Sequence, residues 1–441
     1  MIEHAVSPET NRIIVIGAGI AGLTTAMHLQ RAGFAVAIFE ASDGVGGRVR
    51  SDRHPEGFIL DRGFQVVLEA YPALRRAVDI DAALKPSRFG NGAMIWDGKS
   101  RQLLASPLAT PYALPRALMT SSLKHKDKLL LVRLAARARM SSWQSVTEAT
   151  VARHAAGSGI DLLRANGFSD TFVESFARPF WGGITLDRSL GSTAGSLLFT
   201  TKMFLEGSAL LPESGMQGLP DALASRLDEN TIHLNARIDA IEITDRNVVG
   251  MWSGGSLIEG RAVVLATDAH SAKQLCPSIE FPQDPRGCIT VYLAGTREPG
   301  IGKYLLLNAE EQSGVNHLAP LSAVAPSYAP VGQHLVAAVF LDHPRHDDLS
   351  DDGIAQLARV DTARMLGHRF EDWRALSVVR VPFSQFHQPP GFASKLPLNR
   401  TATTGLYLAG EFTHDSSVNG AMLSGETAAQ AIIHDLRSNG R

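Results

Sequence analysis

The stretch I-I-V-I-G-A-G-I-A-G-L, residues 13–23, decides the fold of this chain. Residues 13–16 form a short apolar run of β-branched side chains, which is typical of a buried parallel strand. Gly17, Gly19 and Gly22 then follow in G-x-G-x-x-G spacing. In that spacing the glycines allow a tight turn, the approach of the backbone to a diphosphate, and close packing of a helix on the sheet. We therefore expect a helix at 20–31, ended by Gly33, whose N-terminus faces phosphate.

An acidic residue follows the next predicted strand. Residues 35–39 are strand-like, and Glu40 lies 23 residues after Gly17 (40 − 17). A carboxylate at this place binds the ribose hydroxyls of a dinucleotide and disfavours a ribose phosphate, so NADP is not expected. Because the glycines, the helix and the acid agree, a ligand-binding turn is favoured over an unliganded glycine-rich turn.

The residues after Glu40 distinguish FAD from NAD. Residues 40–48 read E-A-S-D-G-V-G-G-R, and residues 58–65 read F-I-L-D-R-G-F-Q. The first segment resembles the E-A-x-x-x-x-G-G-R signature of the flavin amine oxidase superfamily, and the second resembles its F-x-x-D-x-G segment. That superfamily also holds protoporphyrinogen oxidases and phytoene-desaturase-like enzymes. The resemblance implies that Arg48 assists at the FAD diphosphate, where a planar guanidinium makes two contacts; the alternative is a surface arginine.

The C-terminal end carries the second half of the signature. Residues 405–411 read G-L-Y-L-A-G-E, a strand followed by an acid, and residues 418–425 open a helix that we expect to reach about residue 436. The resemblance implies that Glu411 binds a ribityl hydroxyl of FAD, although aspartate is commoner there. It also implies that the helix N-terminus faces the flavin and stabilises negative charge on it. The alternative is an ordinary amphipathic C-terminal helix.

Two internal segments extend the resemblance from about Asn11 to the C-terminus. Residues 263–269 look like the family's apolar strand ending in A-T, and residues 213–219 look like its P-x-G-G-M-x-x-L entry into a helix. A strand-like stretch at 231–243 would place the backbone of Ile238 against the adenine. The residues that we expect to contact FAD are Gly17, Ala18, Gly19, Ala21, Gly22, Glu40, Ala41, Gly46, Gly47, Arg48, Gly63, Phe64, Gln65, Ile238, Gly410, Glu411, Asn419, Gly420 and Ala421.

The predicted fold class is α/β, with a Rossmann-like FAD domain of the two-dinucleotide-binding type and a smaller α+β substrate domain. The FAD domain is split in sequence over 11–70, 213–285 and 396–441, and the substrate domain takes 71–212 and 286–395. In the first insert we expect helices at 127–140, 145–154, 160–165 and 171–176. In the second we expect strands at 288–294, 335–341 and 377–382 and a helix at 352–366, which together predict a small sheet capped by helices.

Composition excludes several functional classes. The chain has 441 residues, with 42 Lys+Arg against 44 Asp+Glu, so nothing in its charge attracts nucleic acid. Cys276 and Cys288 are its two cysteines; they form no disulfide framework or metal motif, and we expect two buried thiols in a reducing, cytoplasmic compartment. No apolar run approaches the roughly 20 residues that span a bilayer, and residues 1–10 do not resemble a secretory signal. The oligomeric state is left open.

Two further segments allow more than one interpretation. Residues 124–140, K-H-K-D-K-L-L-L-V-R-L-A-A-R-A-R-M, form a basic amphipathic helix. It could lie on a membrane surface, but we favour a helix that packs its Leu/Val stripe into the core and shows Lys and Arg to water. Residues 178–184, R-P-F-W-G-G-I, resemble a segment of the protoporphyrinogen oxidase and desaturase branches. Their aromatic side chains fit an apolar substrate channel and a protein core equally well.

These observations predict an FAD-dependent oxidoreductase that dehydrogenates a mostly apolar small molecule of isoprenoid or tetrapyrrole type, with oxygen or a quinone as final acceptor. A flavin amine oxidase that releases imine and hydrogen peroxide is the alternative. It is disfavoured because Lys303 does not match the family's lysine context and no aromatic pair follows Glu411. A third hypothesis is a flavoprotein that binds FAD only structurally. We expect non-covalent FAD, since His414 is the only candidate for a covalent link, and no separate catalytic acid or base is required.

Overall fold

The computed structural model describes residues 12–105, 123–151, 157–310, 314–341, 346, 348–367, 370 and 373–438. The end of the helix predicted at 145–154 and residues 1–11 lie outside this part of the chain. No helix in the described part is long and apolar enough to cross a membrane.

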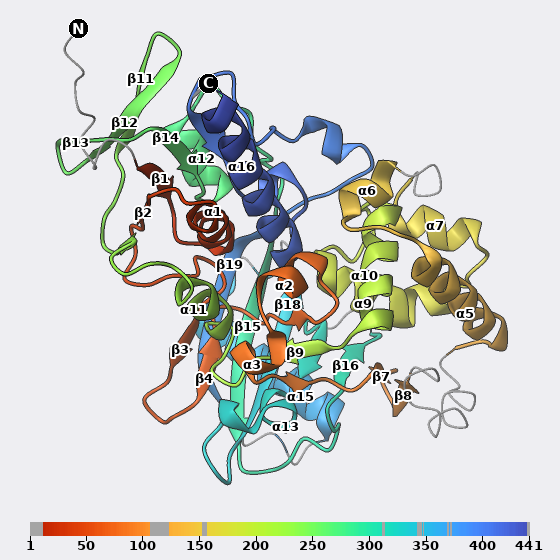
Figure 1. Ribbon diagram of the computed structural model, residues 1–441. Coiled ribbons are helices and arrows are strands. Elements are labelled where there is room, and N and C mark those ends of the chain that lie inside the picture. Colours follow the sequence, from red (N-terminus) through yellow and green to blue (C-terminus); the bar gives the residue numbers. More distant parts are fainter. Residues whose placement is uncertain are drawn as a thin grey trace, which may run out of the picture.

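A five-stranded parallel sheet forms the first layer (Figure 1). Its order is β10 (Ile232–His233), β2 (Val36–Phe39), β1 (Ile13–Ile16), β14 (Ala262–Leu265) and β20 (Leu406–Leu408). Every residue of β1 and β14 is buried, because both faces of a parallel sheet are covered and each strand is therefore apolar throughout. The strands come from inside the three segments assigned to the FAD domain, while the domain boundaries themselves stay a prediction.

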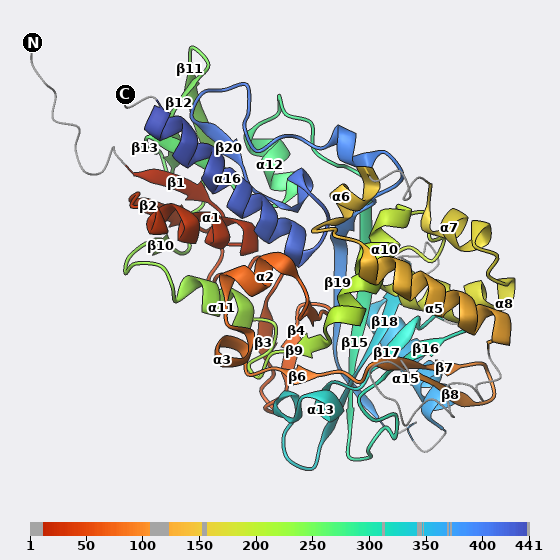
Figure 2. The same ribbon diagram turned by 45° about the vertical axis from the view of Figure 1, so that its right-hand side comes forward.

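The two ends of the chain meet on one face of this sheet. Helix α1 (Ile20–Arg31) lies beside the C-terminal helix α16 (Val418–Ser438), as Figures 1 and 2 both show. Their contact is close at Gly425, where a Cβ would come within 2.6 Å of the Ala21 carbonyl oxygen. A bulkier residue there would push the helices apart, so this glycine allows the first and last segments to build one site.

A seven-stranded sheet forms the second layer. Its order is β19 (Arg374–Phe386), β15 (Pro285–Gly295), β18 (His334–Leu341), β17 (His317–Ala319), β16 (Leu305–Asn308), β7 (Gly92–Trp96) and β8 (Arg101–Ala105). All neighbouring pairs are antiparallel except β16 and β7. The prediction of a small sheet is wrong, because β7 and β8 from the first insert join strands of the second. Helix α15 (Asp351–Leu366) packs on one face through Ile354 and Ala358.

Helices from the first insert gather beside this sheet (Figure 2). They are α5 (His125–Met140), α6 (Val146–Val151), α7 (Gly159–Ala165), α8 (Asp170–Phe172) with a π-helical turn at Val173–Ala177, α9 (Arg178–Thr185) and α10 (Ala194–Glu206). The first four coincide with predicted helices, but α9 and α10 were not predicted. Residues 194–203 of α10 are all buried, so the helix lacks the polar face that would reveal a 3.6-residue period.

A further, smaller sheet lies at the outer end of the parallel sheet (Figure 1). A three-stranded antiparallel sheet of β11 (Ala240–Thr244), β12 (Asn247–Ser253) and β13 (Ser256–Glu259) follows β10, so the strand expected at 231–243 is two separate strands. The remaining named elements near the site are β3 (Ser51–Arg53), β4 (Ile59–Asp61), β5 (Val67–Leu68), α2 (Pro72–Ala77), α3 (Ile80–Leu84), β6 (Ser87–Arg88), β9 (Ala209–Leu211), α11 (Gly218–Ala224), α12 (Ala269–Leu275) and α13 (Leu321–Val324).

Candidate functional site

A cavity of about 1230 Å³ lies between the two layers and the helices of the first insert. Its volume exceeds the roughly 300–1,000 Å³ of a pocket for one small ligand, so a cofactor and a substrate can share it. Fourteen of the residues expected to contact FAD line it: Gly17, Gly19, Ala21, Glu40, Ala41, Gly46, Gly47, Arg48, Phe64, Gln65, Ile238, Gly410, Glu411 and Ala421. The fold therefore brings together residues from all three predicted FAD segments.

The glycine turn after β1 has room for a ligand at one position only. A Cβ on Gly17, whose φ is +105°, would lie 2.8 Å from the Ala266 carbonyl oxygen, and a Cβ on Gly22 would lie 2.1 Å from that of Gly17. At Gly19 no protein atom other than those of Gly19 and its chain neighbours lies within 4 Å of such a Cβ. Gly17 and Gly22 thus allow close backbone packing, whereas Gly19 leaves a space against the N-terminus of α1 that suits a diphosphate.

Glu40 is held at the end of β2 by local hydrogen bonds. Its Oε2 accepts from the amide of Ala18 at 2.8 Å, and its Oε1 accepts from the amide and the hydroxyl of Ser42 at 2.8 and 2.7 Å. A carboxylate has about four lone-pair sites, two on each oxygen, so Oε2 can still accept a hydrogen bond from a ribose hydroxyl. The residues present at this end of the cavity therefore fit a dinucleotide cofactor.

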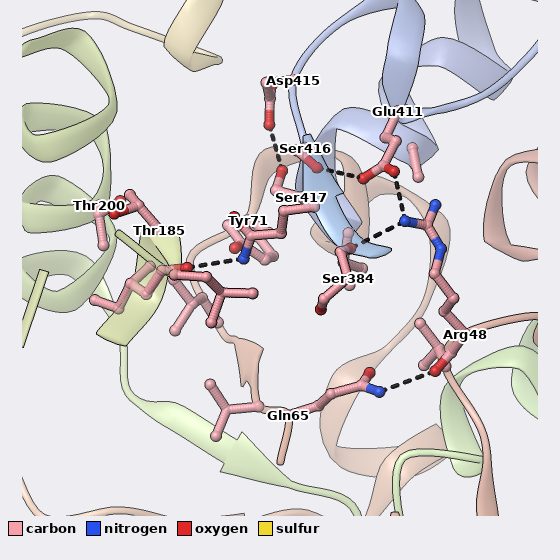
Figure 3. Close-up of a pocket in the computed structure, with 18 of the residues that line it drawn as sticks. Arg48, Gln65, Tyr71, Thr185, Thr200, Ser384, Glu411, Asp415, Ser416 and Ser417 are labelled. Carbon is pink, nitrogen blue, oxygen red and sulfur yellow. Dashed lines mark hydrogen bonds and ion pairs between the residues drawn. The ribbon is translucent and has the colours of Figure 1, made fainter. Parts of the chain in front are cut away.

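Arg48 and Glu411 connect the first and last FAD segments (Figure 3). Arg48 Nη1 lies 2.5 Å from Glu411 Oε1 and donates to the Ser384 carbonyl oxygen at 3.0 Å. The other carboxylate oxygen of Glu411 accepts from the Ser416 hydroxyl at 2.7 Å, and Gln65 Nε2 donates to the Arg48 carbonyl oxygen at 2.9 Å. Because Glu411 is buried and Arg48 is partly exposed at the cavity, the pair places a fixed positive group where the cofactor is expected.

Five of the expected contact residues do not line the main cavity: Ala18, Gly22, Gly63, Asn419 and Gly420. Asn419 is fully buried; its Oδ1 accepts from the Ala73 amide at 3.2 Å and its Nδ2 donates to the Gln144 carbonyl oxygen at 3.3 Å. A Cβ on Gly420 would lie 2.1 Å from the Asp415 carbonyl oxygen. These two residues therefore pack the start of α16 against its surroundings.

The rest of the cavity wall is mainly apolar and aromatic. It includes Leu68, Tyr71, Phe89, Leu129, Leu131, Val132, Val146, Phe176, Phe180, Trp181, Ile184, Phe199, Phe204, Leu205, Leu305, Leu307 and Val339. Tyr71 stacks on Phe199 with ring centroids 6.3 Å apart. Side chains of the aromatic segment at 178–184 line the cavity, and Trp181 also packs edge-on against the core residue Phe176. Its role as a substrate channel stays a prediction.

Polar groups that the sequence did not reveal also face this space. Asp415 is buried, its Oδ1 accepts from the Ser417 hydroxyl, and burial together with the nearby Glu411 charge raises its pKa to about 6. Burial and the Asp415 charge raise the pKa of Tyr71 well above its usual range. His317, on β17, is buried and its pKa is lowered to about 4. Asp415 lies between the two C-terminal motifs, which is the only sequence signal that could have identified it.

Other candidates from the sequence lie away from this space. Lys303 is exposed, and neither it nor His414 lines the cavity. Cys276 and Cys288 form no disulfide and are both buried, which confirms the expectation of two buried thiols. Among the described residues, no group of three or more His, Cys, Asp or Glu side chains is arranged to hold a metal ion.

Comparisons with known proteins agree with this geometry. The family model for flavin containing amine oxidoreductases matches residues 20–433. A 15-cis-phytoene desaturase from Glycine max is 26% identical over 469 residues, which cover 96% of this chain and 79% of the relative. The solved structure of a putative protoporphyrinogen oxidase from Exiguobacterium sp. superposes with a TM-score of 0.74 at 18% identity, over 97% of this chain and 99% of the other. A putrescine oxidase with bound putrescine gives 0.70 at 17% identity, over 96% and 99%. At these identities the two structures show a shared fold alone.

Proposed function

Because the chain belongs to the family of flavin-containing amine oxidoreductases, and is thus an FAD-dependent oxidoreductase, we propose that it dehydrogenates a mostly apolar organic substrate of isoprenoid or tetrapyrrole type. Bound FAD, held without a covalent link, would supply the acceptor for the hydride or electron pair, and oxygen or a quinone would be the final acceptor. One observation carries the proposal: the space bounded by the glycine turn, Glu40 and Arg48 is continuous with one walled by aromatic and aliphatic side chains.

The residues of this chain bind and orient the cofactor and the substrate, and they exclude water from the site. Gly19 and the N-terminus of α1 would bind the diphosphate of FAD, and Glu40 would bind its ribose. Arg48 would offset the negative charge of the diphosphate. On the substrate side, Phe180 and Phe199 supply flat apolar surfaces that bind a conjugated or isoprenoid skeleton and displace water from it. None of these roles requires a protein group to exchange a proton with the substrate.

Similarity to a 15-cis-phytoene desaturase supports an apolar substrate, although at 26% identity it does not identify the substrate. Oxidation of a carbon skeleton would leave a product with two hydrogen atoms fewer and the same heavy atoms. Mass spectrometry of the product, made with the holoenzyme and an artificial quinone, tests the proposal directly. A product that has lost nitrogen after hydrolysis, formed together with peroxide, would contradict it.

Amine oxidation is the second candidate, and a specific observation favours it. Above pH 6 the buried Asp415 is a carboxylate at the cavity wall, where it could pair with a substrate ammonium group. Two observations count against it. Lys303 lies outside the cavity, and the residue after Glu411, Phe412, packs edge-on against Phe281 in the core.

We further propose that α5 docks on an anionic membrane surface. Leu129, Val132 and Met140 share one face of α5 and are 62%, 53% and 82% exposed. The core-facing side is Asp127, Leu134 and Ala138, and Leu130 and Leu131 pack partly against the same core. The expectation that the Leu/Val stripe packs into the core is therefore confirmed only in part, because Leu129 and Val132 face solvent. An apolar stripe at a helical period, exposed to solvent, suits insertion at a lipid interface.

The charge of α5 complements acidic lipid headgroups. Basic side chains flank the stripe at Lys126, Arg133 and Arg139, and Asp127, the helix's one acid, is turned inward. Asp127 accepts from the amide and the hydroxyl of Ser169 at 2.8 and 2.6 Å, so its charge is satisfied inside the protein. Leu129 and Val132 also line the cavity, so a membrane at this face would supply apolar substrate directly to the site.

A further inference from the structure

Three residues that line the cavity carry a buried polar side-chain atom without a hydrogen-bond partner in the described part of the chain. They are Trp181 Nε1, His317 Nε2 and Asp415 Oδ2. A buried donor or acceptor left unpaired costs roughly 1–3 kcal/mol, so such an atom in a binding cavity points to a group that the ligand supplies. Among these, His317 has its hydrogen-bonding role defined by its neighbours.

Arg188 and Asn316 fix which ring nitrogen of His317 carries the proton. Arg188 Nη1 donates to Asn316 Oδ1 at 2.7 Å, and the amide nitrogen of Asn316 donates to the Pro179 carbonyl oxygen at 3.0 Å. The same amide nitrogen lies 3.0 Å from His317 Nδ1. Because an arginine can only donate, Asn316 Oδ1 is the acceptor and Nδ2 the donor. His317 Nδ1 must therefore accept, which leaves the proton on Nε2 of a neutral ring.

The surroundings of His317 keep the ring neutral and positioned. It is buried, and burial lowers its pKa to about 4, so the ring stays uncharged in the neutral range. Its cross-strand neighbours, Leu307 on β16 and Val339 on β18, are apolar and also line the cavity. Phe64, from the segment expected beside the flavin, packs edge-on against the ring with centroids 5.3 Å apart. His317 is thus a residue of the cavity wall whose Nε2–H is fixed among apolar neighbours, is buried and has no partner among the described residues.

We infer that the Nε2–H of His317 donates a hydrogen bond to a neutral acceptor on the substrate, such as a carbonyl, hydroxyl or ether oxygen or an unprotonated nitrogen. The substrate is then a mostly apolar molecule that carries a heteroatom, and not a pure hydrocarbon polyene. This inference deepens the proposed function and rests on it, because it assigns a role in substrate binding to a residue of the same cavity. His317 is a positioning and specificity residue in this account, since no proton leaves Nε2.

The tautomer can be measured without turnover. We expect two-dimensional ¹H–¹⁵N spectra of holoenzyme labelled with ¹⁵N-histidine to show a protonated Nε2 and an unprotonated Nδ1 for His317, identified by the signals lost in His317→Gln. The opposite tautomer, or a charged ring at pH 7, would overturn the inference. This measurement decides the point even if no substrate reduces the flavin, so its failure is distinct from failure of the proposed function.

Binding of a matched pair of probes tests the acceptor. β-Ionone is an isoprenoid ketone, and its control is the hydrocarbon with CH₂ in place of the carbonyl; each is titrated while the visible spectrum of the bound oxidised flavin is followed. We expect the ketone to bind roughly tenfold more tightly to the wild-type holoenzyme, the worth of one hydrogen bond that satisfies a buried donor. Equal affinity for the two probes, or no binding of either, would overturn the inference.

Three variants separate hydrogen bonding from packing. His317→Leu removes the donor and should abolish the preference for the ketone, while His317→Gln retains an N–H and should restore part of it. Val339→Ala opens space beside the ring without removing a donor, so it should lower the affinity for both probes equally. The flavin spectrum and midpoint potential should be the same in His317→Leu and wild type. A shift of the potential would mean that Nε2–H bonds the flavin, and a ketone preference that survives His317→Leu would also contradict the inference.

Discussion

Arg48 and Glu411 form an ion pair, with Nη1 2.5 Å from Oε1, although they come from opposite ends of the chain. Arg48 comes after β2, directly behind Gly46 and Gly47, and Glu411 follows β20 at one edge of the same sheet. The pair therefore exists only when the first and last segments are assembled, and it lies in the wall of the cavity that both segments build.

Removing Arg48 should weaken both the cofactor site and the fold. In Arg48→Ala the buried Glu411 loses its cationic partner, and we expect the free energy of unfolding to fall by about 2 kcal/mol. FAD affinity should fall at least tenfold, because a cationic group near the diphosphate is gone. Urea denaturation and FAD titration measure the two effects. Arg400→Ala is the matched control: its pair with Asp435 is exposed, so it should cost less than 1 kcal/mol and leave FAD binding unchanged.

Two glycines three residues apart should behave differently when changed to alanine. Gly19→Ala places a methyl group where no protein atom other than those of its chain neighbours lies within 4 Å, so the variant should fold with a melting temperature close to wild type but purify with little FAD. Gly22→Ala would bring a Cβ within 2.1 Å of the Gly17 carbonyl oxygen, and we expect a loss of about 2 kcal/mol or more in stability. Retention of full FAD content by Gly19→Ala would contradict the placement of the diphosphate.

Asp415 should make stability depend on pH in the acidic range. Its pKa is raised from 3.8 to about 6, so the folded protein binds this proton more tightly than the unfolded chain does. The contribution of Asp415 to the free energy of unfolding is fully present below pH 4 and is lost as the pH rises through 6. This loss amounts to roughly 2–3 kcal/mol.

The Asp415→Asn variant isolates this effect. We expect the stability of this variant to depend less on pH between 4 and 6 than that of the wild type. We also expect the variant to be more stable than the wild type at pH 8. Thermal unfolding with FAD present measures both. Burial also raises the pKa of Asp61 to about 6, but Asp61 contributes equally to both proteins and cancels in the difference. A parallel pH dependence of variant and wild type would refute the assignment.

The apolar stripe of α5 should control membrane binding. We expect the wild-type protein to sediment with vesicles that contain phosphatidylserine and much less with pure phosphatidylcholine. Leu129→Asp combined with Val132→Asp should reduce binding at least tenfold, because each change replaces apolar contact with an acidic charge. Val360→Asp on α15 is the matched control, since Val360 is a helical valine that is 52% exposed, close to the 53% of Val132. Equal loss of binding in the control would argue against docking through α5.

The sequence predicted closely the elements that the first and last segments form and the fact that these segments meet. The expected helix at 20–31 coincides with α1, and the glycines, Glu40 and Arg48 meet residues 410–421 at one cavity. This was possible because few residues other than glycine allow the required backbone conformation, and because the acid follows the second strand at the expected spacing.

The substrate half could not be predicted in the same way. Helix α10 is buried along residues 194–203 and has no polar face, and the orientation of α5 depends on which of two apolar sides meets the core. His317 lies in a three-residue strand, and its donor role depends on the preceding Asn316 and on Arg188, which reaches Asn316 only in the folded chain. Such roles come from tertiary hydrogen bonds that leave no local pattern in the sequence.

Anaerobic reduction of the bound flavin tests the central claim most directly. The purified holoenzyme is mixed without oxygen with two sets of compounds, primary and secondary amines in one and polyenes, isoprenoid ketones and porphyrinogens in the other, while the oxidised flavin band is followed. We predict bleaching by at least one apolar compound and none by simple amines. Bleaching by an amine alone, or a protein that shows no flavin band even after FAD is added, would contradict it.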